Sequence, residues 1–479
     1  MSILKDAFET AYKKSPEALT ANGAFTLKTT LNSVLDFFFF AGGSRIRSAD
    51  EHTNMFRNAF MQHGELATQA LLWSRDIRGG AGERALFRNV LKDIRANHSA
   101  RWLHTLPVIA EVGSWKDLFV VAPIPTAYEV NFVYTALRNG DGLCAKWFPR
   151  KGSWFNLTAA QYGLKPSQLR RKIVDLSNTV EQQMCANKWE DIEFGKVPSL
   201  AMSRYKNCFS KNTPELFQGY LNAVEEGKEK INASAVFPHD VLRSTLSPQA
   251  TQVQWDALPN YLEGSTERIL PMCDVSGSMD TAISGGITAM NICVSLGLYI
   301  AERNEGVFHN EVLTFSSRPE LHEIVGDNIV EKSRNLSRAH WGMSTDITRA
   351  FYTLLHKAHV HKVAKTEMPT TILIFSDMEF DPSWGCESTA LEQIKREYEI
   401  KGYELPKIVF WNLNGRPGNV PARAQQENVA LVSGFSPAIL TAILAGKEIT
   451  PMSVMLEAID TPKYRRLASQ ALHGVNLAK

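Results

Sequence analysis

The feature that most constrains the fold is a series of short apolar runs in the second half of the chain. Five runs rich in Val, Ile, Leu and Phe follow one another after residue 266, and helical stretches such as 289–304 and 346–360 separate them. Strands that alternate with helices form parallel sheets whose two faces are covered by those helices. The pattern therefore predicts a doubly wound α/β domain over residues 266–445.

The first half of the chain has a different pattern. Between residues 54 and 231, several segments place apolar side chains at spacings of three and four, which indicates amphipathic helices. Short breaks rich in Gly, Pro, Asn and Ser separate them, and strand-like alternation is nearly absent. We expect residues 1–260 to form an all-α array of stacked, HEAT-like helices. Residues 446–479 are helical again, and we expect this tail to pack back on the array.

Composition and termini favour a cytoplasmic protein. No run reaches the 18 apolar residues typical of a transmembrane helix, and residues 1–15 lack the apolar core of a secretory signal. The six cysteines are scattered without any C-x-x-C pair, which argues against a disulfide framework and against a zinc ribbon. We expect reduced thiols.

An oxygen-rich motif follows the first predicted strand. Residues 271–280 read PMCDVSGSMD, with Asp274, Ser276 and Ser278 at alternate positions. Ligands of doubly wound sheets bind beyond the carboxyl ends of the strands, and alternate residues of an extended turn point the same way. Three oxygens at one point, one of them a carboxylate, suit Mg²⁺ or Mn²⁺. In the alternative interpretation, Asp274 and Ser276 only cap the following helix.

Two further stretches are expected at the same edge of the sheet. GMSTDITRAF (342–351) supplies Thr345 at the start of a helix, and ILIFSDMEF (372–380) supplies Asp377 after a strand. With the first motif they resemble the metal-ion-dependent adhesion site of von Willebrand factor A domains, over roughly residues 266–445. The resemblance implies that Mg²⁺ or Mn²⁺ is bound, directly or through water, by Asp274, Ser276, Ser278, Thr345 and Asp377. It also implies that a vacant position on the metal takes an acidic residue or another anionic oxygen from a protein partner.

A catalytic role for the metal would need a positioned general base or a second metal. His356, His359 and His361 are the evident candidates, but they lie roughly 15–20 Å from the Thr345 loop at 1.5 Å per helical residue. We therefore expect a binding protein without enzymatic activity. A metal-dependent nuclease or phosphatase is the less favoured interpretation.

Basic residues concentrate in one part of the first half. Residues 138–175 hold eight Lys and Arg against two Asp, a net charge of +6, which suits a polyanion. Aromatic residues lie among them, and single-stranded RNA uses cations for its phosphates and flat rings for its bases. The nominated RNA-binding residues are Lys146, Trp147, Arg150, Lys151, Trp154, Arg170, Arg171 and Lys172. Alternatively, the aromatic side chains belong to the core and the charges form a solvated face.

A Gly-rich turn at residues 75–84 offers a second possible phosphate site. It carries Arg75, Arg78 and Arg84, but Asp76 and Glu83 are available to pair with these cations inside the protein. The sequence leaves the two interpretations open.

The combination of a helical first half with this α/β domain resembles the Ro autoantigen and its bacterial relatives, in which TROVE-type helical repeats form a ring that holds RNA. Five strings are similar to a Ro-like family of phages and plants: RDIRGGAGER (75–84), VGSWKDL (112–118), AKWFPRK (145–151), VPSLAMSRY (197–205) and INASAVFPHDV (231–241). The resemblance implies a cytoplasmic ribonucleoprotein scaffold that holds structured or misfolded small RNA and recruits a protein partner, such as a nuclease. The alternative is a metal-dependent assembly factor that binds no RNA.

Overall fold

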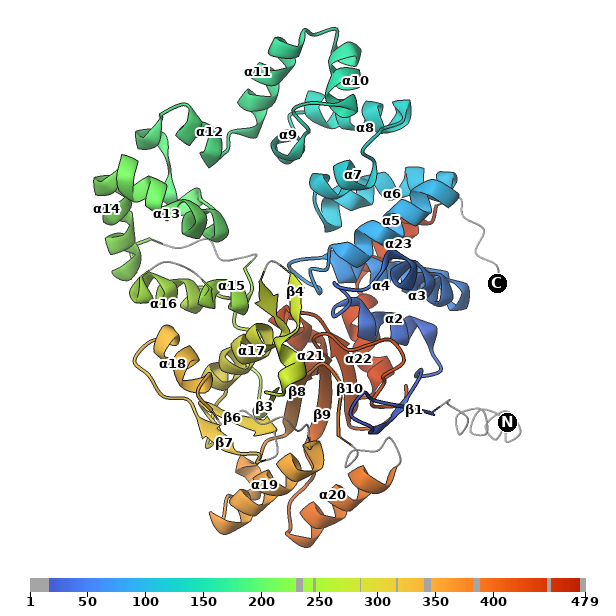
Figure 1. Ribbon diagram of the computed structural model, residues 1–479, viewed down its shortest axis with the longest axis vertical. Coiled ribbons are helices and arrows are strands. Elements are labelled where there is room, and N and C mark those ends of the chain that lie inside the picture. Colours follow the sequence, from blue (N-terminus) through green and yellow to red (C-terminus); the bar gives the residue numbers. More distant parts are fainter. Residues whose placement is uncertain are drawn as a thin grey trace. The chain divides into compact units, whose positions relative to one another are not determined.

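The computed structural model describes residues 17–229, 236–243, 247–284, 286–315, 318–339, 346–381, 388–445 and 449–473 (Figure 1). The chain divides into two compact units. The α/β unit comprises Met1–Leu86, Ala235–Arg243 and Leu258–Arg465, and the helical unit comprises Phe87–Ser234, Ser244–Ala257 and Arg466–Lys479. This division differs from the predicted boundary near residue 260, because the first helices of the chain pack on the C-terminal sheet.

The α/β unit is built on a six-stranded sheet in the order β10-β9-β8-β3-β6-β7. Its strands are β3 (Ile269–Asp274), β6 (Glu311–Phe315), β7 (Leu321–Glu323), β8 (Thr371–Ser376), β9 (Lys407–Asn412) and β10 (Val429–Ser433). Each of the five predicted runs contains one of the parallel strands. Strand β7, which the sequence analysis did not predict, pairs antiparallel with β6 and makes the sheet mixed. Every residue of β3 and β8 is buried, as expected for strands covered on both faces.

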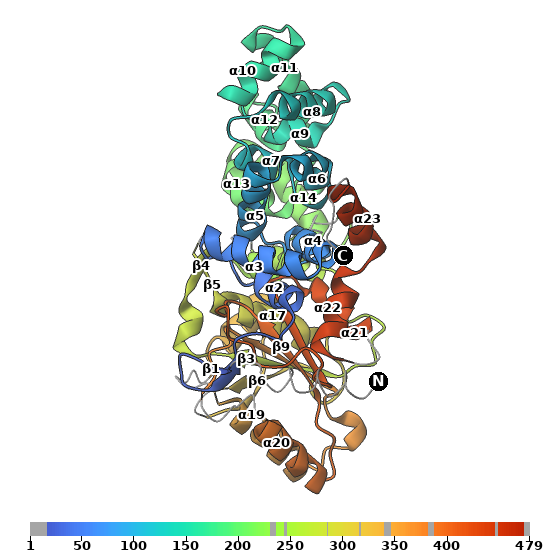
Figure 2. The ribbon, with the colours of Figure 1, turned by 90° about the vertical axis from the view of Figure 1, so that its right-hand side faces the viewer.

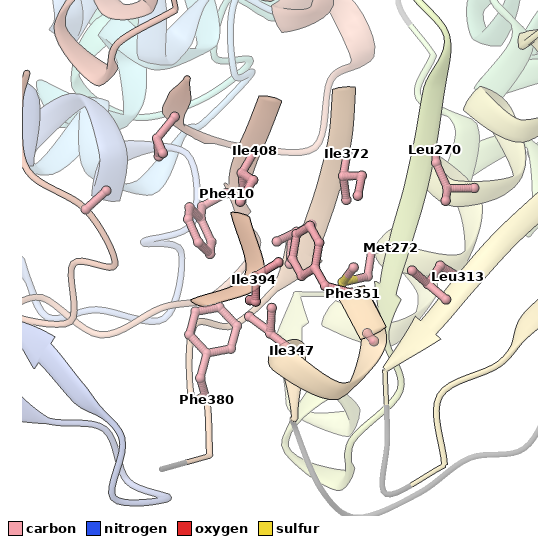
Figure 3. Packing of buried hydrophobic residues seen from close by; sticks show 14 of the residues in the cluster. Leu270, Met272, Leu313, Ile347, Phe351, Ile372, Phe380, Ile394, Ile408 and Phe410 are labelled. Carbon is pink, nitrogen blue, oxygen red and sulfur yellow. The ribbon is translucent and has the colours of Figure 1, made fainter. Parts of the chain in front are cut away.

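Helices cover both faces of this sheet. The helices of this part of the unit are α15 (Pro238–Leu242), α17 (Ala289–Arg303), α18 (Ile329–Leu336), α19 (Ile347–Val360), α20 (Ser388–Ile400), α21 (Leu440–Ala445) and α22 (Pro451–Ile459), of which α15 and α18 pack on α17. Figure 3 shows Phe351 of α19 and Ile394 of α20 packed with Met272 of β3. The next residue along β3, Cys273, contacts α17 through a hydrogen bond from its thiol to the Cys293 carbonyl. Because successive strand residues point to opposite faces, α17 lies on the face opposite α19 and α20.

The N-terminal residues complete the α/β unit. They form a hairpin of β1 (Glu17–Leu19) and β2 (Phe25–Leu27), followed by α2 (Ser33–Ala41), α3 (Ala49–Gln62) and α4 (Gly64–Arg75). Helix α2 lies beside β10 and α22 (Figures 1 and 2). The Ser433 hydroxyl at the end of β10 donates to the Phe38 carbonyl at 2.9 Å and accepts from the Gly42 N–H at 2.9 Å. These contacts explain why residues far from the sheet in sequence belong to the same unit.

The helical unit contains α6 (Ser99–Val112), α7 (Trp115–Val121), α8 (Ala127–Arg138), α9 (Gly142–Trp147), α10 (Ser153–Tyr162), α11 (Pro166–Ser177), α12 (Val180–Cys185), α13 (Ser199–Asn212), α14 (Pro214–Glu225) and α16 (Pro248–Asp256), with most of α5 (Ala85–Asn97) and part of α23 (Pro462–Ala471). Buried acids join its successive helices. Glu129 of α8 accepts hydrogen bonds from Arg95 of α5 and from the Trp102 indole of α6, both at 2.7 Å. The predicted helical character of the first half is thus present in the described residues, apart from the β1–β2 hairpin. None of the described helices is both long and apolar enough to cross a bilayer.

Candidate metal centre

The strand order places a topological switch between β3 and β8. From β3 the chain moves to β6 on one side, and it later returns to β8 on the other side of β3. Ligands of such sheets bind beyond the carboxyl ends of the strands, at the point where the order reverses. Asp274 is the last residue of β3, and Asp377 directly follows the last residue of β8. Both carboxylates therefore lie at the switch point.

Hydrogen bonds connect the oxygen-bearing side chains at this point. Asp274 accepts from the Ser276 N–H at 3.0 Å and from the Ser376 hydroxyl at 2.6 Å. The hydroxyl oxygens of Ser276 and Ser278 lie 3.0 Å apart, and the Ser278 side chain is close enough to Asp377 to lower the pKa of that carboxyl. The structure thus brings together four of the five predicted ligands. Thr345 lies outside the described residues.

The structure contradicts the alternative in which Asp274 and Ser276 only cap the following helix. Ser276 precedes a 3₁₀ turn, Gly277–Asp280, but its side chain makes no capping hydrogen bond there. The next α-helix, α17, begins at Ala289 and is capped by Thr288, which accepts from the Asn291 N–H. The oxygens of Asp274 and Ser276 face the neighbouring strand and Ser278 instead.

The electrostatics of the site favour a bound cation. Asp274 is 0 % exposed and Asp377 is 5 % exposed. Burial raises the pKa of Asp274 to about 7, and the nearby Asp377 carboxylate adds to the rise. Burial also raises the pKa of Asp377, although the Ser278 side chain opposes this. Within the described part of the chain neither carboxylate has an ion-pair partner, so a cation would relieve both their burial and their repulsion.

The donor set also indicates which ions fit. Two carboxylates and two hydroxyls are hard oxygen ligands, which Mg²⁺ and Mn²⁺ prefer. Over the described ranges, no group of three or more His, Cys, Asp or Glu residues could hold a metal. His356, His359 and His361 lie within these ranges, so they do not make up such a group.

The loop that carries Asp377 is held by residues that the sequence analysis did not identify. In the β1–β2 hairpin, Asn22 donates its side-chain amide to the Glu379 carbonyl at 2.7 Å, and the Thr20 hydroxyl donates to the Phe380 carbonyl at 2.6 Å. Between Asp377 and Glu379, Met378 has a φ of 67°, in the left-handed region. A non-glycine residue adopts that conformation only where its surroundings enforce it. Nothing in the local sequence of the hairpin predicts that it supports this loop.

The structure contradicts one of the nominated RNA-binding residues. Trp154 is 2 % exposed, its indole N–H donates to the Ala122 carbonyl at 2.6 Å, and its ring packs against Phe119 with centroids 5.0 Å apart. A ring buried in this way cannot stack on a base, so Trp154 is a core residue. In the structure Trp154 lies with Phe155 and Ala159 on the buried face of α10, while the equally apolar Leu157 of the same helix is exposed, so the sequence of α10 alone did not mark the buried face.

Trp147 has the opposite environment. It is 39 % exposed, and the ammonium groups of Lys116 and Lys146 lie 5.0 and 5.8 Å from its ring centroid. Lys116 lies on α7, outside the basic run, and was not predicted. The ring and its two lysines, Lys116, Trp147 and Lys146, form what we call the Trp147 platform.

The remaining nominated cations belong to the same unit. Lys151, Arg170 and Arg171 are exposed, Arg150 and Lys172 are half-buried, and burial lowers the pKa of Arg150. The Arg170 guanidinium lies 5.1 Å from the ring centroid of Phe155. All five cationic side chains are therefore at least partly exposed at the surface of the helical unit.

At the Gly-rich turn, both acids pair with cations from elsewhere in the α/β unit. Asp76 accepts from Lys463, and from the Tyr464 hydroxyl at 2.9 Å. Glu83 accepts from the Arg45 side chain at 2.6 Å. Arg75 is buried. The turn is thus part of the packing between the first helices and the C-terminal segment.

The chain is similar to two family models, a viral protein and a solved bacterial structure. A family model described as "Domain of unknown function (DUF7788)" matches residues 268–469, and one described as "Domain of unknown function (DUF2828)" matches residues 161–266. "Uncharacterized protein L728" of Acanthamoeba polyphaga mimivirus is 27 % identical over 507 residues, which cover 92 % of this chain and 87 % of that protein. The crystal structure of the Deinococcus radiodurans RO (RSR) protein aligns with 90 % of this chain and 100 % of its own, at 13 % identity and a TM-score of 0.39.

Proposed function

We propose that the protein is a cytoplasmic, non-enzymatic scaffold that attaches a protein partner through a divalent cation and binds single-stranded RNA on its helical unit. The observation that carries the first part is the meeting of Asp274, Ser276, Ser278 and Asp377 at the switch point of the sheet. In this proposal the four side chains hold Mg²⁺ or Mn²⁺. The bound ion supplies a position that accepts an anionic oxygen from the partner.

The metal is tested by titrating the purified chain with Mn²⁺ and measuring free Mn²⁺ by electron paramagnetic resonance. Asp274→Asn keeps the shape of the side chain but removes one charge, and we expect at least about a tenfold loss of affinity, the lower limit for changes around metal sites. Asp327→Asn, at an exposed acid of the same unit, is the matched control. Equal affinities of the wild type and Asp274→Asn would contradict the proposed site.

Thermal unfolding gives an independent readout of the same site. A ligand that binds only the folded state stabilises it by about 2.7 kcal/mol at 100 times its dissociation constant. Excess Mg²⁺ should therefore raise the melting temperature of the wild type but not that of Asp274→Asn. Without metal, Asp274→Asn should have a higher melting temperature than the wild type, because the variant lacks the repulsion between two buried carboxylates.

The Trp147 platform supports RNA binding by the helical unit. The ammonium groups of Lys116 and Lys146 lie over the exposed Trp147 ring. In this proposal the two long side chains turn to the phosphates of the RNA, and the ring then stacks on an unstacked base. The exposed cations Lys151, Arg170 and Arg171 extend the positive charge of this unit. RNA binding by stacking and charge does not depend on the RNA sequence, since every base has a face that can stack.

Fluorescence anisotropy with labelled single-stranded RNA tests this part. Trp147→Ala should weaken binding by about 1–3 kcal/mol, the value of one base stack. Reversal of Arg170, Arg171 and Lys172 to Glu should weaken it further and reduce its dependence on salt. The matched control reverses three exposed cations of α20 and the turn after it, Lys395, Arg396 and Lys401. An affinity that stays constant from low to moderate salt would exclude electrostatic RNA binding and favour the assembly factor without RNA.

A further inference from the structure

Exposed apolar side chains gather at one edge of the six-stranded sheet. Among the described residues between 258 and 465, four large apolar side chains are exposed, namely Val307, Val325, Val360 and Ile400. The first lies just before β6, and the second just after β7, which runs antiparallel to β6. The other two are the last residues of α19 and α20, the helices that lead to β8 and β9. All four therefore lie where the parallel strands begin, on a surface that we call the amino edge, opposite the candidate metal centre.

Contacts join the parts of the amino edge into one surface. Helices α19 and α20 lie side by side (Figures 1 and 2). In the turn after α20, the Tyr403 hydroxyl lies 3.2 Å from the Ala358 carbonyl oxygen and 2.9 Å from that of Val363. On the other side of α19, the Lys357 ammonium donates to the Leu321 carbonyl of β7 at 3.3 Å. The exposed ends of α19 and α20 thus belong to a surface that continues to β7.

A cavity of about 650 Å³ opens at the amino edge. Its apolar part consists of the buried residues Met368, Pro369, Tyr403 and Pro406. Glu399 and Gly402 also line it, so Ile400 lies beside the cavity, and its side chain is 72 % exposed. One face of the unit thus carries both a protruding apolar side chain and a hollow with apolar walls.

We propose that the amino edge is an interface between two copies of this chain related by a two-fold axis, with Ile400 of each copy in the cavity of the other. Contiguous exposed apolar side chains mark interaction sites. In a two-fold interface the same surface serves both copies, so a protrusion and the hollow that receives it must occur on one face. The amino edge has both. Because this interface occupies the edge opposite the candidate metal centre, it leaves that centre accessible on each copy.

The charges at the cavity fit a copy of the same chain. The lining holds three acids and three cations, Glu267, Glu399, Glu404, Arg268, Lys365 and Lys407. Glu267 and Lys407 pair with each other at 2.9 Å, and the other four are balanced in sign. A polyanion such as RNA, or an anionic membrane, gains no net attraction from such a surface. A second copy brings acids to the cations of the first and cations to its acids, which is the complementarity that favours association.

The test is sedimentation equilibrium of the full-length chain over a series of concentrations, with a chelator present so that no metal contributes. We expect the wild type to pass reversibly from monomer to dimer. Ile400→Glu should raise the dissociation constant of the dimer at least about tenfold, because it places a charge on the apolar anchor of the interface. Met61→Glu, at an exposed apolar residue of α3 in the same unit, is the matched control and should leave the dissociation constant unchanged.

Exchange of charges tests the two-fold arrangement. Lys365→Glu and Glu404→Lys change two exposed residues of the cavity lining. Each variant alone should dimerise more weakly than the wild type, because like charges then meet across the axis, and an equimolar mixture of the two should recover dimers.

Three results would overturn the inference. A wild type that stays a monomer at every concentration would leave the amino edge to a different protein. A dimer that Ile400→Glu does not weaken would place the contact elsewhere on the chain. A mixture of Lys365→Glu and Glu404→Lys that associates no better than its components would show that these charges do not meet across a two-fold axis.

Discussion

Gly42 provides a sharp test of how the first helices dock on the sheet. The residue ends α2 with φ −72°, a conformation that alanine adopts readily. Propensity alone would make Gly42→Ala stabilising by about 1 kcal/mol. A Cβ at this position, however, would lie 2.5 Å from the backbone nitrogen of Gly434 and 2.5 Å from the carbonyl carbon of Ser433. Non-bonded carbon atoms normally approach only to about 3.5 Å, so α2 would have to move by about 1 Å.

The cost of that movement exceeds the gain in propensity. Overpacking of this kind costs about 1–3 kcal/mol. A shift of α2 would also stretch the hydrogen bond from the Gly42 N–H to the Ser433 hydroxyl, which contributes about 1 kcal/mol. We therefore expect Gly42→Ala to destabilise the α/β unit by about 1–3 kcal/mol after the gain in propensity is subtracted.

The assay combines urea unfolding with amide hydrogen exchange, because exchange resolves the two units. Gly42→Ala should lower the unfolding midpoint and speed exchange in α2 and β10. Gly219→Ala is the matched control, since Gly219 lies inside α14 and a Cβ there would meet no heavy atom within 4 Å. That control should stabilise its helix by about 0.5–1 kcal/mol. A Gly42→Ala protein as stable as the wild type would show that α2 does not meet β10 as described.

Three further predictions concern other parts of the α/β unit and the site. Burial alone would raise the pKa of Asp76, but hydrogen bonds, with that from Lys463 foremost, hold it below its usual value. Its stabilising contribution is therefore present above about pH 4, the pKa in the unfolded chain, and is lost as the pH falls through the folded value. Asp76→Asn should cost about 1–3 kcal/mol at pH 7 and flatten the acid limb of a pH series of urea unfolding curves. Asn22→Ala should weaken Mn²⁺ binding several-fold with a loss of only about 1 kcal/mol in unfolding free energy, because it frees the Glu379 carbonyl in the loop that carries Asp377. The purified chain should leave labelled hairpin and single-stranded RNA intact in Mg²⁺ and in Mn²⁺; cleavage that disappears in Asp377→Ala would make the site catalytic.

The sheet and the core of the site could be predicted because their signals are local. A strand buried on both faces reads as a continuous apolar run, and β3 and β8 both do. Once the runs are assigned to parallel strands, the residues at their carboxyl ends must share one edge. That rule placed Asp274 and Asp377 at the same edge, whereas the choice of Asp377 as a metal ligand came from the resemblance to the metal-ion-dependent adhesion site.

The support of the loop after β8 and the Trp147 platform could not be predicted, because they depend on contacts between residues far apart in sequence. Strands β1 and β2 have only three residues each, and nothing in their sequence indicates that they hold the loop after β8. Lys116 joins Trp147 only because α7 packs on α9. Trp154 was nominated because it lies among basic residues in sequence, and only its packing on Phe119 and its hydrogen bond to Ala122 show that it belongs to the core.

The docking of α2 has a consequence for synthesis of the chain. Phe37 and Phe38 find partners early, with ring centroids 5.6 Å from Phe56 and 4.5 Å from Trp73. Phe39 and Phe40 belong to the core cluster that includes Leu431 of β10, which is translated about 390 residues later. At roughly 5–20 residues per second, that interval lasts about 20–80 s. Throughout it, the nascent chain carries an apolar helix face outside the ribosome that a chaperone can bind.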